Sequence, residues 1–376
     1  MTPEDLIQPH LLHMQPYTPI VPFEVLSQRL GIPASEIVKL DANENLYGPS
    51  PRALAAMAHA DKLHIYPDPD QAELRSAIAD YIGVPMAHIL CGAGADEIIQ
   101  IIGQAFIQPG DGIVDLPPTF GMYKWIADVM NASYISVPRG ESFALDVEAI
   151  EDDVRRRTAV VGRPSSTPPP KLLFVTNPNN PDGSTIDDAT LKRLLALPLI
   201  VVLDEAYIDF SSQPSRAGWV QQYPNLIVMR TFSKLLGMAG MRIGYGIFPL
   251  EIIQHLWKIK QPYTPTVASS IGAVAALQDR EHLRDNVQRI VQERQRMGEL
   301  LSKLVWLQVY PSETNFLLCR VFTSKTSGQQ VKNYLEQKGI LVRYFDKDGL
   351  RDCFRISIGK PEHTDKLIDA LKIVEP

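Results

Sequence analysis

The sequence has few residues that would form disulfides or bind a metal. Its three cysteines, Cys91, Cys319 and Cys353, lie far apart, and no two of them form a C-x-x-C pair. This spacing argues against a disulfide framework and against a zinc site, so we expect no metal. We interpret the three residues as buried thiols in a protein of a reducing compartment.

Long apolar segments are also missing. The longest one runs from Leu194 to Leu203, contains Pro198 and stops at Asp204. It is far too short to span a bilayer. The first ten residues, MTPEDLIQPH, have neither the basic start nor the apolar run of a signal peptide. We therefore expect a cytosolic protein with no membrane partner.

An excess of positive charge is absent as well. The 37 basic and 43 acidic residues give a formal net charge of -6. Such a chain has no general attraction for nucleic acid, so an anionic ligand must be held by a few local cations. A length of 376 residues with 45% hydrophobic residues is typical of a globular protein with two domains.

Short apolar runs alternate with amphipathic segments from about residue 38 onward. Strands are expected at 88–91, 112–115, 134–137, 172–175, 199–203, 226–230 and 243–248, and helices between them at 71–81, 96–107, 120–130 and 187–195. Several strands are continuously apolar, as expected when helices cover both faces of a sheet. The pattern predicts an α/β fold with a mostly parallel central sheet.

Proline content and the pattern of expected helices and strands divide the chain into three parts. Residues 1–37 are punctuated by prolines and are expected to form an extended arm, and residues 38–265 form the large domain. A long helix at 285–304, short strands and a closing helix at 363–373 predict a smaller α+β domain over 266–376. The proline-rich segment RPSSTPPP (163–170) reads as a surface loop within one domain, in preference to an interdomain linker.

Two glycine- and proline-rich segments follow predicted strands. CGAGADE (91–97) precedes a helix, where glycines allow close approach and free N–H groups attract phosphate. A tight turn without a ligand is the alternative. NPNNPDG (177–183) lies where open α/β sheets bind ligands, and Asn180 is able to present its amide to a cofactor oxygen. The alternative there is a proline-rich turn.

A third segment, LIVVLDEAYIDF (199–210), places Asp204 at the end of an apolar strand, with Tyr207 just beyond it. A carboxylate in that position is costly unless it is paired, and a pyridinium nitrogen is a suitable partner. The alternative role for Asp204 is the N-cap of a helix.

The fourth segment, RTFSKLLGMAGMRIGYG (230–246), places Lys234 after a strand. A lysine removed from water has a lowered pKa and is able to form an imine, whereas a solvated surface lysine is the alternative. Thr231, Ser233 and Arg242 offer phosphate donors nearby. Farther on, Arg343 and Arg355 occupy two strand-like segments, either clamping one anion or forming separate surface salt bridges.

In this order, the segments resemble the fold-type I aminotransferases that depend on pyridoxal 5'-phosphate (PLP), and within them the histidinol-phosphate aminotransferase family. The resemblance extends from DANEN (41–45) to FRISIG (354–359). Its closest stretches are GADE (94–97), PPTFGMY (117–123), NNPDG (179–183), DEAYIDF (204–210), AGW (217–219), RTFSK (230–234) and AGMRIGY (239–245). The sequence departs from the family pattern at Phe120, where many relatives have tyrosine, and at Asp182, where many have threonine.

The resemblance implies a role in cofactor binding for each residue at a motif position. For the ring, it implies that Lys234 forms the Schiff base, that Asp204 faces the pyridine nitrogen, that Tyr207 and Asn180 bond the 3'-oxygen, and that Phe120 stacks on the ring. For the phosphate, it implies binding by the backbone of Ala95 and Asp96 and by the side chains of Ser233 and Arg242, with Thr231 as a weaker candidate. It also implies that Tyr66 reaches the phosphate of a neighbouring subunit. The last role implies a homodimer with shared active sites.

The resemblance also implies a reaction, the transfer of the amino group of L-histidinol phosphate to 2-oxoglutarate, giving imidazole-acetol phosphate and L-glutamate in histidine biosynthesis. Arg355 would hold the substrate phosphate and later the glutamate α-carboxylate, Arg343 would assist with the phosphate, Asn180 would contact the substrate, and Tyr17 or Phe23 would cap it. The alternatives are an aromatic amino acid aminotransferase, a PLP decarboxylase of a phosphorylated amino acid, and a PLP-binding regulator without turnover. The acidic charge balance disfavours a DNA-bound regulator.

Overall fold

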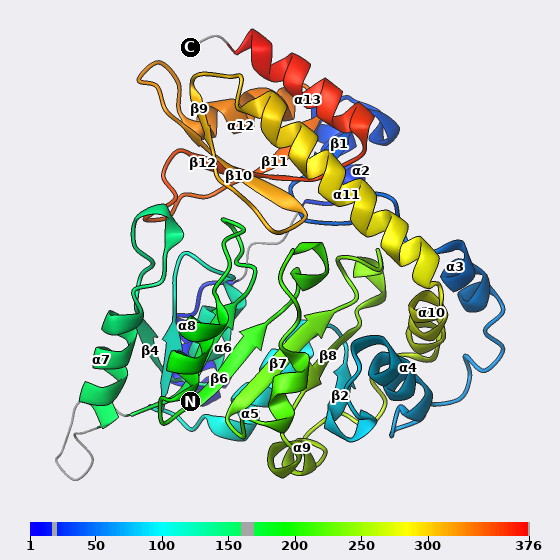
Figure 1. Cartoon of the computed structure of the whole chain (residues 1–376), viewed down its shortest axis with the longest axis vertical. Helices are drawn as coiled ribbons and strands as arrows, with labels where there is room; N and C mark the ends of the chain where they lie inside the picture. The colour runs from blue at the N-terminus through cyan, green and yellow to red at the C-terminus, as the bar shows by residue number, and fades with distance from the viewer. Residues whose placement is uncertain (17–20, 159–168, 375–376) are drawn as a thin grey trace.

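Two β-sheets organise the computed structural model, which describes residues 1–16, 21–158 and 169–374 (Figure 1). The larger sheet has the strand order β2-β8-β7-β6-β5-β3-β4. Strands β7, β6, β5, β3 and β4 are parallel, and β8 runs antiparallel to both of its neighbours. The strands are β2 (Ile89–Gly92), β3 (Gly112–Asp115), β4 (Ser133–Ser136), β5 (Pro170–Thr176), β6 (Ile200–Asp204), β7 (Leu226–Thr231) and β8 (Gly244–Ile247). The predicted α/β class with a mostly parallel sheet is confirmed.

Helices cover both faces of the larger sheet. Leu172 and Phe174 of β5 belong to an apolar cluster with α5, α6 and α9, whereas Leu173 and Val175 belong to a second cluster with α4, α7 and α8. Consecutive residues of a strand point to opposite faces, so both sets of side chains are buried. This arrangement explains why the strands are continuously apolar in sequence.

The smaller sheet has the order β1-β11-β12-β10-β9 and lies above the larger sheet in Figure 1. It is antiparallel except at β1, which pairs in parallel with β11. Its strands are β1 (Val38–Leu40), β9 (Leu307–Val309), β10 (Phe316–Val321), β11 (Ile340–Tyr344) and β12 (Cys353–Ser357). The helix α11 runs from this sheet toward α10, beside the larger sheet (Figure 1).

Thirteen α-helices occur in the described ranges. They are α1 (Pro9–Leu12), α2 (Phe23–Leu30), α3 (Pro51–Ala58), α4 (Ala72–Ile82), α5 (Ala95–Phe106), α6 (Met122–Val129), α7 (Val147–Thr158), α8 (Asp188–Leu195), α9 (Leu250–Leu256), α10 (Val267–Gln278), α11 (Arg280–Leu301), α12 (Gly328–Gln337) and α13 (Pro361–Ile373). No helix in the described part of the chain is long and apolar enough to cross a membrane.

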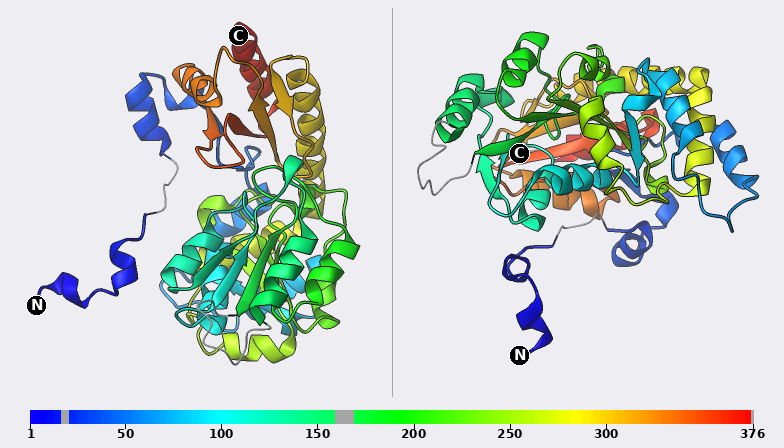
Figure 2. Two further views of the ribbon diagram at one scale, coloured as in Figure 1. Left: turned by 90° about the vertical axis from the view of Figure 1, so that its left-hand side faces the viewer. Right: turned by 90° about the horizontal axis from the view of Figure 1, so that it is seen from below.

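The N-terminal segment differs from the expected extended arm. The helix α2 forms within it because Leu26 packs with Ile37 and Leu341, and Gly31 ends the helix in the left-handed conformation at φ 66°. The first residues project from the body of the molecule in both views of Figure 2. The ring nitrogen Nε2 of His10 lies 3.2 Å from the carbonyl oxygen of Val129.

The proposed domain limits at residues 38 and 266 stay a prediction. Near each limit, an element contacts the part of the chain to which the prediction did not assign it. The strand β1 extends the smaller sheet, and α10 packs against α3 and α4 beside the larger sheet. Most of the expected surface loop 163–170 lies outside the described residues, and only its last residue, Pro170, begins a strand, β5.

Candidate active site

Side chains from separate segments of the sequence meet at one edge of the larger sheet. Asp204 ends β6 and Thr231 ends β7, and parallel strands end at the same edge. The antiparallel strand β8 begins there, because Gly244 pairs with both Thr231 and Gly92. The segments that follow β5, β6 and β7 and the helix that follows β2 therefore surround one site.

Asp204 lies at the bottom of this site, and its exposed fraction is only 4%. Its Oδ2 accepts a 2.7 Å hydrogen bond from the hydroxyl of Tyr123, and its Oδ1 accepts one of 2.9 Å from the backbone N–H of Ala206. The Tyr123 hydroxyl also lies 2.7 Å from Oγ1 of Thr176. The carboxylate is therefore fixed from two sides.

Burial dominates the electrostatics of Asp204. It raises the pKa of this carboxyl, whereas the Tyr123 hydroxyl, the Ala206 N–H and the charge of Lys234 lower it. Burial and the nearby Asp204 charge raise the pKa of Tyr123, so its hydroxyl stays protonated and donates. A cationic ring nitrogen would be a favourable partner for such a carboxylate.

A continuous series of contacts links the smaller sheet to Lys234. Nη1 of Arg355 donates a 2.6 Å hydrogen bond to Oδ1 of Asn180, and Nδ2 of Asn180 lies 3.4 Å from the Tyr207 hydroxyl. Nζ of Lys234 lies 5.5 Å from the centre of the Tyr207 ring. Among the described residues, the Lys234 amine has no hydrogen bond or ion pair.

Asn43 joins this series, although the sequence analysis did not include it. Its Nδ2 donates a 3.0 Å hydrogen bond to the Tyr207 hydroxyl, and its backbone N–H donates one of 2.7 Å to Oγ of Ser357. Tyr123 was missed as well. Both residues lie within resemblance stretches, DANEN (41–45) and PPTFGMY (117–123), which could have identified them.

Two arginines face the site from the smaller sheet. Arg343 of β11 and Arg355 of β12 are paired across antiparallel strands, so their side chains lie on the same face. Nη2 of Arg355 also donates a 2.8 Å hydrogen bond to the carbonyl of Asp41. Like charges placed opposite each other are unfavourable unless an anion lies between them.

The start of α5 provides a group of free backbone donors. The helix follows Gly94, which has no side chain to cap the first amides, and begins with Ala95 and Asp96. A Cβ at Gly244 would lie 2.3 Å from the Ala95 nitrogen, so only glycine allows this approach. Nη2 of Arg242 donates a 2.8 Å hydrogen bond to Oδ2 of Asp96. Backbone donors at the start of a helix, with an arginine beside them, are suited to bind an anion.

Thr231 and Ser233 line the same region. The Thr231 hydroxyl donates a 3.0 Å hydrogen bond to Oγ of Ser233 and accepts one of 3.1 Å from the Ser233 N–H. Ser233 is buried, whereas Thr231 is partly exposed. The pair therefore adds hydroxyl donors close to Lys234.

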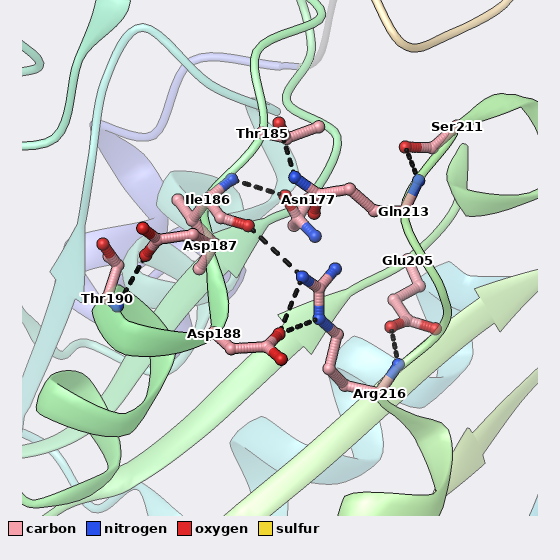
Figure 3. A network of polar contacts seen from close by, with 10 residues as sticks. All are labelled: Asn177, Thr185, Ile186, Asp187, Asp188, Thr190, Glu205, Ser211, Gln213 and Arg216. Carbon is pink, nitrogen blue, oxygen red and sulfur yellow. Dashed lines mark hydrogen bonds and ion pairs between the residues drawn. The ribbon is translucent and has the colours of Figure 1, made fainter.

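A polar network holds Asn177 and the residues around it, at the start of the turn after β5 (Figure 3). Oδ1 of Asn177 accepts a 2.8 Å hydrogen bond from the N–H of Ile186. On the neighbouring turn, Arg216 donates through Nη2 to Asp188 at 3.0 Å and through its N–H to Glu205 at 2.6 Å. The residues after β5 are thereby held against those after Asp204 on β6.

The remaining candidates lie in three different settings. Phe120 is partly buried, and its ring packs edge to face on Tyr123 with centroids 5.8 Å apart. Tyr66 is 75% exposed and stacks on Tyr263 at 4.3 Å, so within one chain it lies on the surface. Tyr17 is outside the described residues, and Phe23 packs beside the cluster of Leu26 and Ile37.

Comparison with known proteins places the chain in a family. Residues 35–371 match the family "Aminotransferase class I and II". The chain is 47% identical over 375 residues to the histidinol-phosphate aminotransferase of Roseiflexus castenholzii, covering 98% of each chain. It is also 47% identical over 372 residues to the chloroplastic histidinol-phosphate aminotransferase of Nicotiana plumbaginifolia, covering 99% of this chain and 87% of that protein.

Its fold also matches a solved structure. The structure of histidinol-phosphate aminotransferase from Sinorhizobium meliloti in complex with pyridoxal-5'-phosphate superposes with a TM-score of 0.88 at 27% identity, covering 98% of this chain and 97% of that one. The chain therefore belongs to the class I and II aminotransferases and, within them, to the histidinol-phosphate aminotransferase family.

Proposed function

We propose that the chain transfers the amino group of L-histidinol phosphate to 2-oxoglutarate, giving imidazole-acetol phosphate and L-glutamate, as a step of histidine biosynthesis. The family supports the reaction class. The observation that carries the proposal is the contact series from Arg355 through Asn180 and Tyr207 to Lys234, beside the buried Asp204. The series supports the proposal because it joins a guanidinium suited to bind an anion to the amine that would react.

The residues of the site fit PLP. The uncapped start of α5 and the space kept by Gly244 suit a phosphate, and the buried carboxylate of Asp204 suits a protonated ring nitrogen. Ala95, Asp96, Ser233, Arg242 and, more weakly, Thr231 would hold the phosphate. Tyr207 and Asn180 would hold the 3'-oxygen, and Phe120 would stack on the ring.

PLP, when bound, supplies an electron sink that stabilises negative charge on the substrate Cα. Asp204 would preserve that property, because its negative charge would keep the ring nitrogen protonated. Lys234 would hold the cofactor through its amine, and that amine would serve as the base that takes the Cα proton of the substrate and gives it back at C4'. Tyr207 and Asn180 would orient the cofactor through its 3'-oxygen.

Arg355 and Arg343 explain how one site accepts two substrates in turn. Histidinol phosphate has no carboxylate, so its phosphate is the anion that Arg355 binds, and Arg343 gives this dianion a second partner. In the second half of the reaction, Arg355 binds the α-carboxylate of glutamate. The cation stays in place while the anion changes.

We also propose a homodimer in which Tyr66 contributes to the neighbouring site. Large apolar side chains are exposed together around it, including Leu63 at 64%, Ile65 at 54% and Tyr263 at 47%. Exposed apolar groups of this kind are typical of subunit contacts. Tyr66 itself is 75% exposed within one chain, so a second copy is the partner that it would reach.

A substrate comparison tests the proposal. Purified protein loaded with PLP is given 2-oxoglutarate and either histidinol phosphate or phenylalanine, and glutamate is followed over time. We expect kcat/KM to favour histidinol phosphate by at least about tenfold, since one extra charge-assisted hydrogen bond contributes about 1.5–3 kcal/mol. A preference for phenylalanine would identify an aromatic aminotransferase. Release of carbon dioxide without 2-oxoglutarate would identify a decarboxylase.

A further inference from the structure

The turn before α5 is held in an unusual way. Gly94, at the N-cap position, has φ +85°, and a Cβ there would lie 2.6 Å from Nη2 of Arg242. Glycine therefore keeps Arg242 close to the helix start. Because glycine offers no capping oxygen, another group must fix the turn if the first amides are to point at a phosphate.

Glu97, on the first turn of α5, provides that group. Its side chain folds back so that Oε2 accepts a hydrogen bond from the N–H of Ala93. A Cβ on Gly92 would lie 2.9 Å from the same oxygen, so glycine at 92 leaves room for the carboxylate. The contact resembles the returning half of a capping box, in which a glutamate on the first turn bonds a backbone N–H before the helix.

The second carboxylate oxygen of Glu97 is held by Thr264. The Thr264 hydroxyl donates a 3.1 Å hydrogen bond to Oε1 and accepts one of 3.2 Å from Nζ of Lys260. Lys260 is only 6% exposed and also donates to the Thr264 carbonyl at 2.8 Å. Gln71 bonds the N–H and carbonyl of Cys91 and the carbonyl of Thr264. The turn before α5 and the segment at Thr264 thus form one hydrogen-bonded unit.

We propose that Glu97, supported by Thr264, is a positioning residue for the cofactor phosphate. It holds Ala93 so that the amides of Ala95 and Asp96 face the anion. A carboxylate would repel a phosphate dianion in direct contact, so Glu97 acts through the backbone and not as a ligand. This role rests on the proposed function, because it requires that PLP binds at the start of α5.

The test compares the affinities of the apo chain for PLP and for pyridoxal, which lacks the phosphate. Glu97→Ala removes both hydrogen bonds, and we expect the Kd for PLP to rise about tenfold while the Kd for pyridoxal changes less than about twofold. Glu97→Gln should restore both affinities to within about threefold of the original chain, because its amide is able to accept from Ala93 and donate to Thr264. Glu299→Ala, at an exposed position of α11, is the matched control and should change neither Kd.

Thr264→Val gives an independent measurement if the alanine variant at Glu97 does not fold. It removes one of the two hydrogen bonds, so we expect a rise of about threefold for PLP alone. An unchanged Kd for PLP, or equal losses for PLP and pyridoxal, would overturn the positioning role. If the unmodified chain bound neither compound, the proposed function itself would fail.

Discussion

The hydroxyl of Tyr123 donates a 2.7 Å hydrogen bond to Oδ2 of the buried Asp204. Tyr123→Phe removes this donor and leaves the carboxylate with the Ala206 N–H, so the pKa of Asp204 should rise further above its usual value. We expect kcat/KM to fall about tenfold and the acidic limb of its pH profile to move to higher pH, because the ionised carboxylate is the active form.

The matched control is Tyr134→Phe. It removes a phenol that donates a 2.7 Å hydrogen bond to Asp115 instead. The acidic limb of this control should stay in place. If both variants moved the limb equally, or if Tyr123→Phe left it unchanged, the electrostatic role of Tyr123 would be refuted.

Asp115 should make the stability of the protein depend on pH. Burial raises its pKa from 3.8 to about 6, against opposing hydrogen bonds from Tyr134 and the Leu116 N–H. The folded chain therefore holds this proton between about pH 4 and 6, where the unfolded chain has released it, and stability falls as the pH rises through that window. Asp115→Asn does not titrate and should lack this contribution.

Chemical unfolding of both chains gives the measurement. The free energy of unfolding of the native chain, minus that of Asp115→Asn, should decrease by about 2 kcal/mol between about pH 4.5 and 7. A difference that is constant over this range would show that the pKa of Asp115 is the same in the folded and unfolded chains.

The order of strands and helices in the larger sheet was predictable because each strand is a short apolar run. The strand predicted at 112–115 matches β3, and the one predicted at 199–203 differs from β6 by one residue at each end. The strand β1 was not predicted, since three residues carry no periodic signal and its partner β11 lies about 300 residues away. The helix α2 was missed because nearby prolines concealed a short amphipathic segment.

The residues of the site also differ in whether the sequence alone identifies them. Asp204 was identifiable because a carboxylate ends an apolar strand, which is a local signal. The contact between Arg355 and Asn180 joins β12 to the turn that follows β5, so only the folded chain reveals it. Asn43 illustrates this limit most clearly, because its bonds to Tyr207 and Ser357 depend on three segments meeting.

Arg343 should contribute more to the reaction of histidinol phosphate than to that of glutamate. Arg343→Ala removes the second cation opposite Arg355, so we expect kcat/KM for histidinol phosphate to fall about 10–100-fold and that for glutamate to fall less than about threefold. Single-turnover measurements of each half-reaction provide the comparison. Arg343→Lys keeps the charge without the fork of donors and should be intermediate. Equal losses for both substrates would contradict the assignment.

The proposed dimer predicts that a charge at Ile65 weakens the contact between subunits. Ile65 is 54% exposed and adjoins Tyr66. Ile65→Lys places a charge in an apolar contact, so the dimer dissociation constant should rise at least about tenfold, and activity should fall on dilution. Ile373→Lys, at a position of α13 that is 73% exposed, is the matched control and should alter neither property. Sedimentation velocity measures both. A dimer unaffected by Ile65→Lys would place the subunit contact elsewhere.

Covalent attachment of PLP to Lys234 is the central claim, and borohydride reduction tests it most directly. The loaded protein is reduced and digested, and the modified peptide is identified by mass spectrometry. We predict one reduced cofactor per chain, carried on Nζ of Lys234, and no stable adduct in Lys234→Ala. An adduct on another lysine, such as the buried Lys260, or the same adduct in the alanine variant, would contradict the account.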